Sequence, residues 1–134
     1  MKTSEISVRT GERYEFVSIT DEVHRAVRGA GVEEGVCVVC STHTTAAVTV
    51  NEDYDRDVAR DLTAACRALV GSLEVRFVHA EGNSDSHFLT SLFGQSQHLL
   101  VRGGALDLGR WQGGVLAEFD GPRSRTVRVA VYPA

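Results

Sequence analysis

The sequence lacks any long apolar run. No stretch of its 134 residues approaches the ~20 consecutive apolar residues that a helix needs to cross a bilayer. The first sixteen residues, MKTSEISVRTGERYEF, alternate polar and apolar side chains and contain no hydrophobic signal-peptide core. A membrane protein and an exported protein are both disfavoured, and we expect a soluble protein of the cytoplasm.

Clustered positive charge is also missing. The net charge is -4, and the 14 lysines and arginines are scattered along the chain. A nucleic-acid binder typically carries a basic face with interleaved aromatic residues, and none is visible here. The densest basic run, Arg123, Arg125 and Arg128, is short and favours an anion pocket. We therefore expect neither nucleic acid nor a membrane as a partner.

Cysteine is scarce, and its pattern argues against a disulfide framework. The three cysteines, Cys37, Cys40 and Cys66, cannot all pair with one another. Cys37 and Cys40 have CxxC spacing, but side chains three apart on a strand point to opposite faces, which disfavours a shared zinc or a disulfide. Cys66 falls on the apolar stripe of a predicted helix. We predict three buried structural thiols, in keeping with a reducing compartment.

Length and composition predict one domain over residues 1–134. The hydrophobic fraction of 43% and the charged fraction of 24% are ordinary for a globular chain. No repeat, low-complexity segment or flexible linker divides the sequence. A chain of this size can bury one substantial core but not two.

The N-terminal half predicts three or four strands. Residues 5–9 alternate as a half-exposed strand does, and residues 14–19 return after a turn. Residues 36–41 form a continuous apolar run, which predicts a central strand covered on both faces. Residues 46–50 are predicted to be its antiparallel neighbour or its extension.

Two main helices are predicted. The first begins at Thr20, a favourable N-cap, and ends at Gly29 or Gly31. The second is the clearest in the sequence and has an apolar stripe at i, i+4, i+7 and i+11. Its stripe consists of Val58, Leu62, Ala65 and Leu69, with Cys66 and Val70 beside it.

Strand patterns dominate the remainder. Leu73, Val75 and Phe77 have a period of two, and the ranges 98–102, 106–120 and 126–132 also read as strands. Gly103 and Gly104 predict a hairpin turn. Strands follow each other directly, so we predict an α+β fold with a mostly antiparallel sheet or sandwich. A parallel doubly wound sheet would need a helix between most strands.

Three histidines fall in polar surroundings at the ends of predicted strands. His43 lies just past the central apolar run, His79 continues the period of two, and His87 ends the polar loop 81–86. Three imidazoles with an open fourth position make a catalytic zinc shell. Asp85 can orient such ligands or act as a general base. The spacing matches no short zinc motif, so hydrogen-bonded structural histidines remain the alternative.

A second candidate cluster follows residue 118. Arg123 and Arg125 flank a tight turn and can clamp a phosphate or a carboxylate. The alternative is a solvated turn with surface charges. Trp111 can wall a pocket, although a lone tryptophan is more often core packing. Glu52 lies between a strand and a helix, where its alternative role is to cap the helix.

Four motifs, in order along the chain, carry a resemblance to a known family. They are STHTTAAVTVNE (41–52), HAEGNSDSHF with the SLFG that follows it (79–94), LGRWQG (108–113) and FDGPRSR (119–125). At these positions the chain resembles the YjbQ-like family, often labelled secondary thiamine-phosphate synthase. The resemblance implies a compact α+β fold and a homotrimer. It also implies a metal ion at His43, His79 and His87, with Glu52, Asp85, Trp111, Glu118 and Arg123 nearby.

The resemblance also suggests a reaction. Thiamine phosphate synthesis joins a pyrimidine carried on pyrophosphate to a thiazole phosphate. Glu52, Asp85 and Glu118 are then catalytic candidates, and the substrate-binding candidates are Thr42, Thr44, Thr45, Trp111, Arg123 and Arg125. Pyrophosphate chemistry usually uses magnesium on carboxylates, whereas three imidazoles prefer a zinc-like divalent ion. The alternatives are a metal-dependent hydrolase of a phosphorylated metabolite and a trimer that binds a metal or metabolite without turnover.

Overall fold

The computed structural model describes residues 1–134 and contains three helices and eight strands. The helices are α1 (Thr20–Ala30), α2 (Arg56–Gly71) and α3 (Ser84–Phe93). The strands are β1 (Lys2–Arg9), β2 (Glu15–Ser18), β3 (Glu34–Ser41), β4 (Ala46–Glu52), β5 (Ser96–Arg102), β6 (Ala105–Leu106), β7 (Gln112–Glu118) and β8 (Ser124–Pro133). Every strand pairing is antiparallel, which confirms the α+β prediction.

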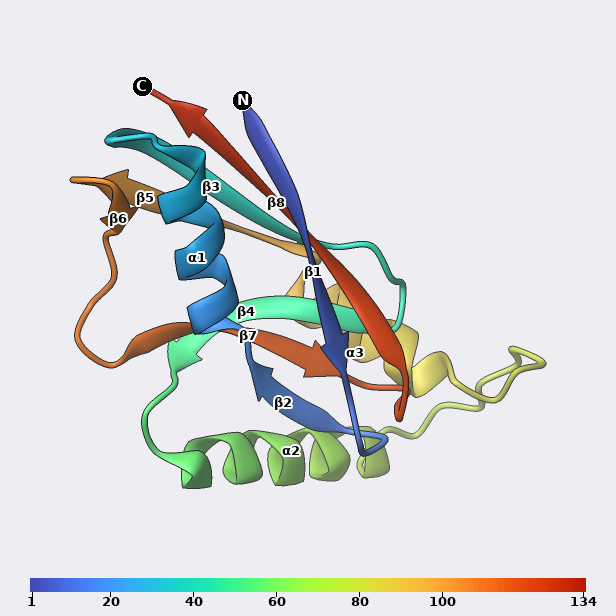
Figure 1. Ribbon diagram of the computed structural model, residues 1–134. Coiled ribbons are helices and arrows are strands. Elements are labelled where there is room, and N and C mark those ends of the chain that lie inside the picture. Colours follow the sequence, from blue (N-terminus) through green and yellow to red (C-terminus); the bar gives the residue numbers. More distant parts are fainter.

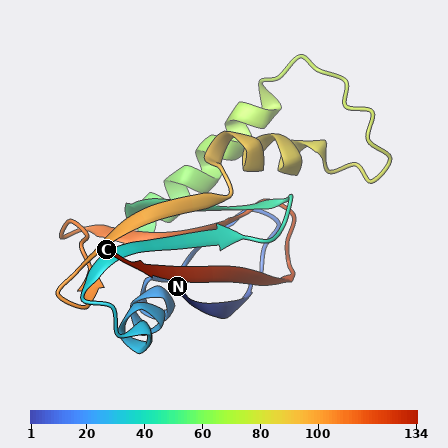
Figure 2. The same cartoon turned by 90° about the horizontal axis from the view of Figure 1, so that it is seen from above.

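The elements form three layers (Figure 1). A five-stranded sheet in the order β1-β8-β3-β5-β6 packs on a three-stranded sheet in the order β2-β7-β4, and α1 packs against the core that they enclose. Helices α2 and α3 cover the other face of the three-stranded sheet. The outer face of the five-stranded sheet has no helix over it, as the view from above shows (Figure 2).

The three-stranded sheet is buried on both faces because it lies between two cores. Leu116 of β7 packs into the larger core, while its neighbours Val115 and Ala117 pack into the smaller one under α2 and α3. Phe119 continues the second core and stacks edge-on with Tyr14. This rigid middle layer carries the candidate site residues at the ends of its strands.

Two expectations for the central strand are wrong. Cys37 and Val39 of β3 are buried, but Val36 is 36% exposed, so only one face of β3 is covered within the chain. Residues 46–50 belong to β4, which pairs with β7 in the other sheet, while β3 lies between β5 and β8. The polar stretch 42–45 turns the chain from one sheet to the other.

The predicted strand at Leu73–Phe77 is also absent. Residues 73–79 are irregular, with no strand partner in the chain. The polar loop predicted to end at His87 is instead partly helical, because α3 begins at Ser84. A period of two gives a strand only where a neighbouring strand accepts the backbone hydrogen bonds.

The predictions that depend on local periodicity are confirmed. α1 and α2 lie where they were predicted, and Asp55 caps α2 by accepting from Asp57 N–H at 2.9 Å. The predicted N-cap of α1 is wrong, because Ile19 holds the cap position and the Thr20 hydroxyl donates to Asp53 instead. Gly103 and Gly104 adopt positive φ values of 59° and 74° in the turn between β5 and β6. The range 106–120 divides into β6 and β7, with an irregular connection between them.

The cysteines are free. Cys37 and Cys66 are buried and Cys40 is half-buried. Burial raises the pKa of Cys37 to about 11 and also raises the pKa of Cys66, so both stay as neutral thiols. None of the three helices is both long and apolar enough to cross a membrane.

Candidate functional site

A buried ion pair joins the end of β7 to the start of β8. The side chains of Glu118 and Arg125 are 0% and 3% exposed. Arg125 Nε donates to the two carboxylate oxygens of Glu118 at 2.9 and 3.1 Å, and Arg125 Nη2 also donates to Glu118. Thr10 Oγ1 donates to the same carboxylate at 2.7 Å. Burial opposes ionisation of Glu118, but the hydrogen bonds from Arg125 and Thr10 outweigh it and lower the pKa.

The same arginine anchors the turn between the two sheets. Arg125 Nη2 donates to Thr45 Oγ1 at 2.8 Å and to the Thr45 carbonyl oxygen at 3.3 Å. All three side chains are buried and engaged within the chain. The geometry therefore favours a role for Glu118, Arg125 and Thr45 in holding the 42–45 turn, in place of the catalytic or phosphate contacts expected from the sequence.

His43 lies on this turn and is half-buried. Its Nε2 accepts the Thr126 backbone N–H at 2.8 Å, and its carbonyl oxygen accepts from Gln95 Nε2 at 2.8 Å. Burial lowers the pKa of His43, and the nearby Arg125 charge lowers it further. An Nε2 that accepts a hydrogen bond is unprotonated, so the neutral ring carries its proton on Nδ1.

We expect His43 to remain neutral down to pH values below 6.5, the ordinary pKa of histidine. Because the unfolded chain takes up this proton at higher pH than the folded chain, the contribution of His43 to stability is complete above pH 6.5. It is lost as the pH falls toward the lower folded pKa. Long-range ¹H–¹⁵N NMR spectra recorded between pH 8 and pH 5, about the range in which histidines titrate, give both the tautomer and the pKa. A proton on Nε2 at high pH would contradict this assignment.

The other two histidines lie together. The rings of His79 and His87 are 5.5 Å apart between centroids and nearly perpendicular, at 76°. His87 is on the first turns of α3, whereas His79 lies in the irregular segment before α3 and has a side chain 45% exposed. Sequence position alone had placed both in polar surroundings, and the structure makes them neighbours.

The three histidines do not form one metal shell within this chain. No three His, Cys, Asp or Glu side chains converge closely enough to hold a metal ion. His79 and His87 supply two imidazoles, and Glu81, at 4.0 Å from His79 Nε2, is beyond bonding distance. Two imidazoles do not complete the four-coordinate site that zinc prefers. The residues of a single chain therefore do not fit the expected zinc-like ion.

Asp85 is turned toward the N-terminal segment. Its carboxylate accepts from Arg13 Nη2 at 2.9 and 3.0 Å and from the Tyr14 hydroxyl. Burial alone would raise the pKa of Asp85, but the hydrogen bonds from Tyr14 and Arg13 lower it. Asp85 is thus an ionised anchor for the start of α3 and does not contact His79 or His87 through a hydrogen bond.

A polar hollow of about 540 Å³ lies between the 42–45 turn and α3, and we call it the α3 hollow. No apolar side chain lines it. Its lining residues are Thr44, His87, Thr90, Ser91, Gly94 and Gln95. Thr90 Oγ1 is buried with no hydrogen-bond partner in the chain, as is Asn83 Oδ1 at the start of α3. Buried polar atoms without partners are costly, so they indicate a place for a ligand or water.

Arg123 is the accessible arginine of the FDGPRSR turn. Its Nε donates to the Asp120 carbonyl oxygen at 2.6 Å and its Nη2 to the Asp120 carboxylate at 2.9 Å. Asn83 Nδ2 donates to the same carboxylate at 2.9 Å. Asp120 therefore links this turn to the start of α3.

The remaining predicted residues lie elsewhere. In the β4–β7 pair, Ala46 lies opposite Glu118 and Glu52 lies opposite Gln112. Glu52 is therefore six residues along the sheet from Glu118, a distance of about 20 Å. Glu52 borders a separate hollow of about 620 Å³. Trp111 is 46% exposed and packs edge-to-face with Tyr54, with ring centroids 5.0 Å apart. Within one chain these residues do not meet the histidines.

The structure adds residues that the sequence had not suggested. Thr90, Ser91 and Gln95 line the α3 hollow, and Asn83 has a buried carbonyl oxygen without a partner at the start of α3. Asn83 fell in the predicted polar loop, and the other three were missed because no element was predicted between His87 and residue 98. The apolar residues Phe88, Leu89 and Phe93, at helical spacing, were the available signal.

Comparison with known proteins gives a consistent result. Residues 4–134 match the family described as UPF0047 protein YjbQ-like. The UPF0047 protein MJ1081 of Methanocaldococcus jannaschii is 40% identical over 124 residues, covering 92% of this chain and 89% of that protein. The UPF0047 protein YugU of Bacillus subtilis is 38% identical over 121 residues, covering 90% of this chain and 92% of that protein.

Solved structures show the same fold. A conserved protein of the yjbq/upf0047 family from Clostridium acetobutylicum superposes with a TM-score of 0.92 at 41% identity, covering 96% of this chain and 99% of that one. The hypothetical protein APE1520 of Aeropyrum pernix K1 has a TM-score of 0.93 at 32% identity and full coverage of both chains. The four motifs noted in the sequence fall within these matches.

Proposed function

The chain belongs to the UPF0047, YjbQ-like family, and we propose that it is an enzyme that acts on a phosphorylated small molecule bound in the α3 hollow. One observation carries the proposal: a hollow lined only by polar residues includes His87 of the His79–His87 pair and Thr90, whose buried hydroxyl has no hydrogen-bond partner in the chain. Hydroxyl and imidazole donors suit phosphate oxygens, which accept hydrogen bonds only.

Proton transfer is the chemistry that the pair can supply. Imidazole changes charge near neutral pH and is the commonest general acid and base in enzymes. His87 lines the hollow, while His79 is not part of its lining, has its ring beside that of His87 and is partly open to solvent. In the proposed site, His87 contacts the phosphorylated substrate and His79 is a positioning residue that orients the His87 ring.

The specific reaction we propose is of the thiamine-phosphate synthase type, on the strength of the four family motifs. The thiazole nitrogen forms a bond to the methylene carbon of the pyrimidine as the bond from that carbon to pyrophosphate oxygen breaks. The pyrophosphate leaves with the electron pair. The His87 imidazolium acts as general acid and donates its proton to the leaving pyrophosphate oxygen as negative charge develops there. We assign no step to a metal, because one chain brings only the imidazoles of His79 and His87 together and no third ligand joins them.

The test is a turnover assay with both thiamine precursors, run in magnesium, in zinc and in a chelator. We expect thiamine phosphate and pyrophosphate in equal amounts, and His87→Ala should lower the rate by about 10²–10⁴-fold, as for loss of a general acid. His98→Ala is the matched control because His98 is exposed on β5, outside the α3 hollow.

The other outcomes separate the alternatives. Release of phosphate without thiamine phosphate would replace the transferase with a hydrolase of phosphorylated metabolites. No turnover of either precursor, with phosphate binding that still depends on His87, would reduce the protein to a metabolite-binding one. An unchanged rate in His87→Ala would show that the α3 hollow is not the site of the reaction.

A further inference from the structure

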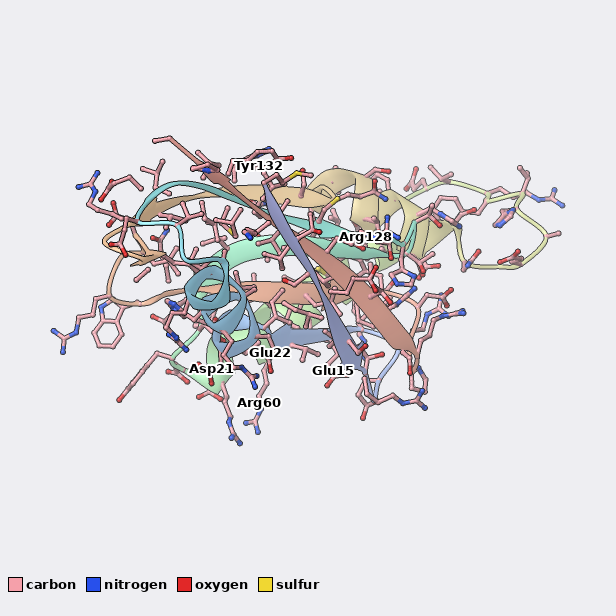
Figure 3. All side chains as sticks on the ribbon, turned by 45° about the horizontal axis from the view of Figure 1, so that its top comes forward. Glu15, Asp21, Glu22, Arg60, Arg128 and Tyr132 are labelled. Atoms are coloured by element: carbon pink, nitrogen blue, oxygen red, sulfur yellow. The ribbon has the colours of Figure 1, made fainter.

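The α3 hollow has a neutral lining apart from the imidazole of His87, because no lysine, arginine or carboxylate lines it. The carboxylates of Asp21 and Glu22 project from α1, on the opposite side of the molecule from α3 (Figure 3). A ligand in this hollow therefore meets hydroxyl, amide and imidazole groups. Its recognition depends on which of these groups can donate a hydrogen bond and which can only accept one.

Thr90 is the buried polar group of the hollow. It is 2% exposed, it lies on α3, and its Oγ1 forms no hydrogen bond within the chain. A threonine hydroxyl in a helix can bond the carbonyl oxygen four residues earlier, as Thr63 of α2 does with Ala59 at 2.9 Å. Thr90 leaves that bond unmade and lines the hollow, so its hydroxyl is available to donate to a ligand.

Two other lining residues offer acceptor oxygens. Ser91 Oγ donates its single hydrogen to the His87 carbonyl oxygen at 2.9 Å, so this hydroxyl can only accept a hydrogen bond from a ligand. The Gln95 amide is oriented by its Nε2, which donates to the His43 carbonyl oxygen at 2.8 Å and leaves Oε1 as an acceptor without a partner in the chain. A phosphate ester dianion has no hydrogen to donate, so the phosphate group alone cannot pair with these two oxygens.

Backbone hydrogen bonds fix the positions of these groups. Gly94 N–H donates to the Thr90 carbonyl oxygen at 2.9 Å, and the Gly94 carbonyl oxygen accepts from Val48 N–H of β4 at 3.3 Å. Ser41 N–H of β3 donates to the Gln95 carbonyl oxygen at 2.8 Å. The end of α3 is therefore tied to both sheets, and the donor and acceptor groups are held in place before a ligand binds.

We propose that the α3 hollow selects phosphate esters that carry a hydroxyl or amino group close to the phosphate. Thr90 donates to a phosphate oxygen, while Ser91 Oγ and Gln95 Oε1 accept from the hydroxyl or amino group. An ester without such a group binds less tightly, because the two acceptors gain no partner from it. This selectivity rests on the proposed function, since it requires a phosphorylated molecule in the hollow.

The first test compares two probes that differ by one hydroxyl, ethyl phosphate and 2-hydroxyethyl phosphate. ¹H–¹⁵N NMR titrations at about pH 7.5, above the second phosphate pKa of about 6, give the two dissociation constants. We expect the native protein to bind 2-hydroxyethyl phosphate about 3–10-fold more tightly, as for one net hydrogen bond. The double variant Ser91→Ala/Gln95→Leu should bind both probes equally, because neither new side chain accepts a hydrogen bond. Both replaced side chains are exposed, so the variant should keep its circular dichroism spectrum.

The second test replaces Thr90 with valine, which has the same shape but no hydroxyl. Because this hydroxyl has no partner in the chain, Thr90→Val should raise the melting temperature of the ligand-free protein by about 3–6 °C. The same variant should bind both probes about 3–10-fold less tightly, and Thr90→Ser should restore the binding. Thr63→Val is the matched control: the Thr63 hydroxyl already bonds Ala59, so this variant should gain no stability and should bind the probes as the native protein does.

The outcomes separate this selectivity from the proposed function. If neither probe binds the native protein, the α3 hollow is not a phosphate site, and both proposals are overturned. If both probes bind with equal affinity and the binding depends on His87, the selectivity is overturned while the proposed function stands. A melting temperature that falls in Thr90→Val would show that the hydroxyl is already bonded in the free protein, and would overturn its assignment as the donor to the ligand.

Discussion

Replacing Arg125 with alanine is expected to lower the free energy of unfolding by about 3–5 kcal/mol, the usual cost of removing one partner from a buried ion pair. The substitution leaves the Glu118 carboxylate 0% exposed with no opposite charge. It also removes the bonds that hold Thr45, and with them the 42–45 turn. Chemical denaturation of the native and variant proteins measures the difference.

The control is the neighbouring arginine. Arg123 also bonds a carboxylate, that of Asp120, but its side chain is 52% exposed. Arg123→Ala should therefore cost less than about 1 kcal/mol, as for other exposed pairs. Equal losses in the two variants would show that burial of the Glu118–Arg125 pair does not set its importance.

Lower pH should reduce the difference in the free energy of unfolding between the native and Arg125→Ala proteins. In the native chain, the lowered pKa of Glu118 gives stability that is present above its ordinary pKa of 4.5 and is lost as the pH falls. In the variant, burial without a partner raises the pKa of the same group, so protonation relieves the cost at a higher pH. A gap that widens on acidification would contradict an ionised Glu118.

Gly121→Ala is expected to destabilise the protein by about 1–3 kcal/mol through overpacking. A Cβ at this position would lie 2.1 Å from the Glu12 carbonyl oxygen and 2.9 Å from both Glu118 Cγ and Thr10 Oγ1. The first contact is backbone, so it cannot be relieved by a change of rotamer. The contacts with Glu118 and Thr10 would displace the side chains that hold the Glu118–Arg125 ion pair in place. Thermal and chemical unfolding report the loss.

Replacing Gly29 with alanine should have the opposite effect on stability. Gly29 lies in α1, and a Cβ there meets nothing within 4 Å. Alanine in a helix is favoured over glycine, so Gly29→Ala should raise stability by up to about 1 kcal/mol. If both variants lost stability equally, the close approach at Gly121 would not be the cause.

Local patterns in the sequence were enough to predict much of the fold. The apolar stripe of α2 and the alternation of Val127, Val129 and Val131 show periods of 3.6 and 2, which neighbouring residues alone determine. Which strands pair is not local. β3 pairs with β5 and β8, which both come later in the chain than β4, and β4 pairs with β7 in the other sheet.

The segment between α2 and α3 shows the limit of periodicity most clearly. Leu73, Val75 and Phe77 have the pattern of a strand, but a strand also needs a partner, and the chain provides none. α3 was missed for a related reason, because its first turn, Ser84–His87, is polar and reads as a loop.

The candidate site was predicted in part. Polar surroundings identified His79 and His87, and the fold brings them together. The sequence could not show that His43 would bond Thr126, which is 83 residues away. It also could not show that Arg125 would turn inward to Glu118, because the reversal between β7 and β8 brings them together only once the sheets have formed.

The position of β8 has a consequence for synthesis of the chain on the ribosome. β8, residues Ser124–Pro133, lies between β1 and β3, the first and third strands to be made. Until β8 emerges, β1 has no strand to pair with, and the larger core lacks the side chains that β8 contributes. The nascent chain therefore cannot complete this sheet, and β1 stays exposed until synthesis ends. A stalled or early-terminated product will be a substrate for chaperones and proteases and not a smaller folded protein.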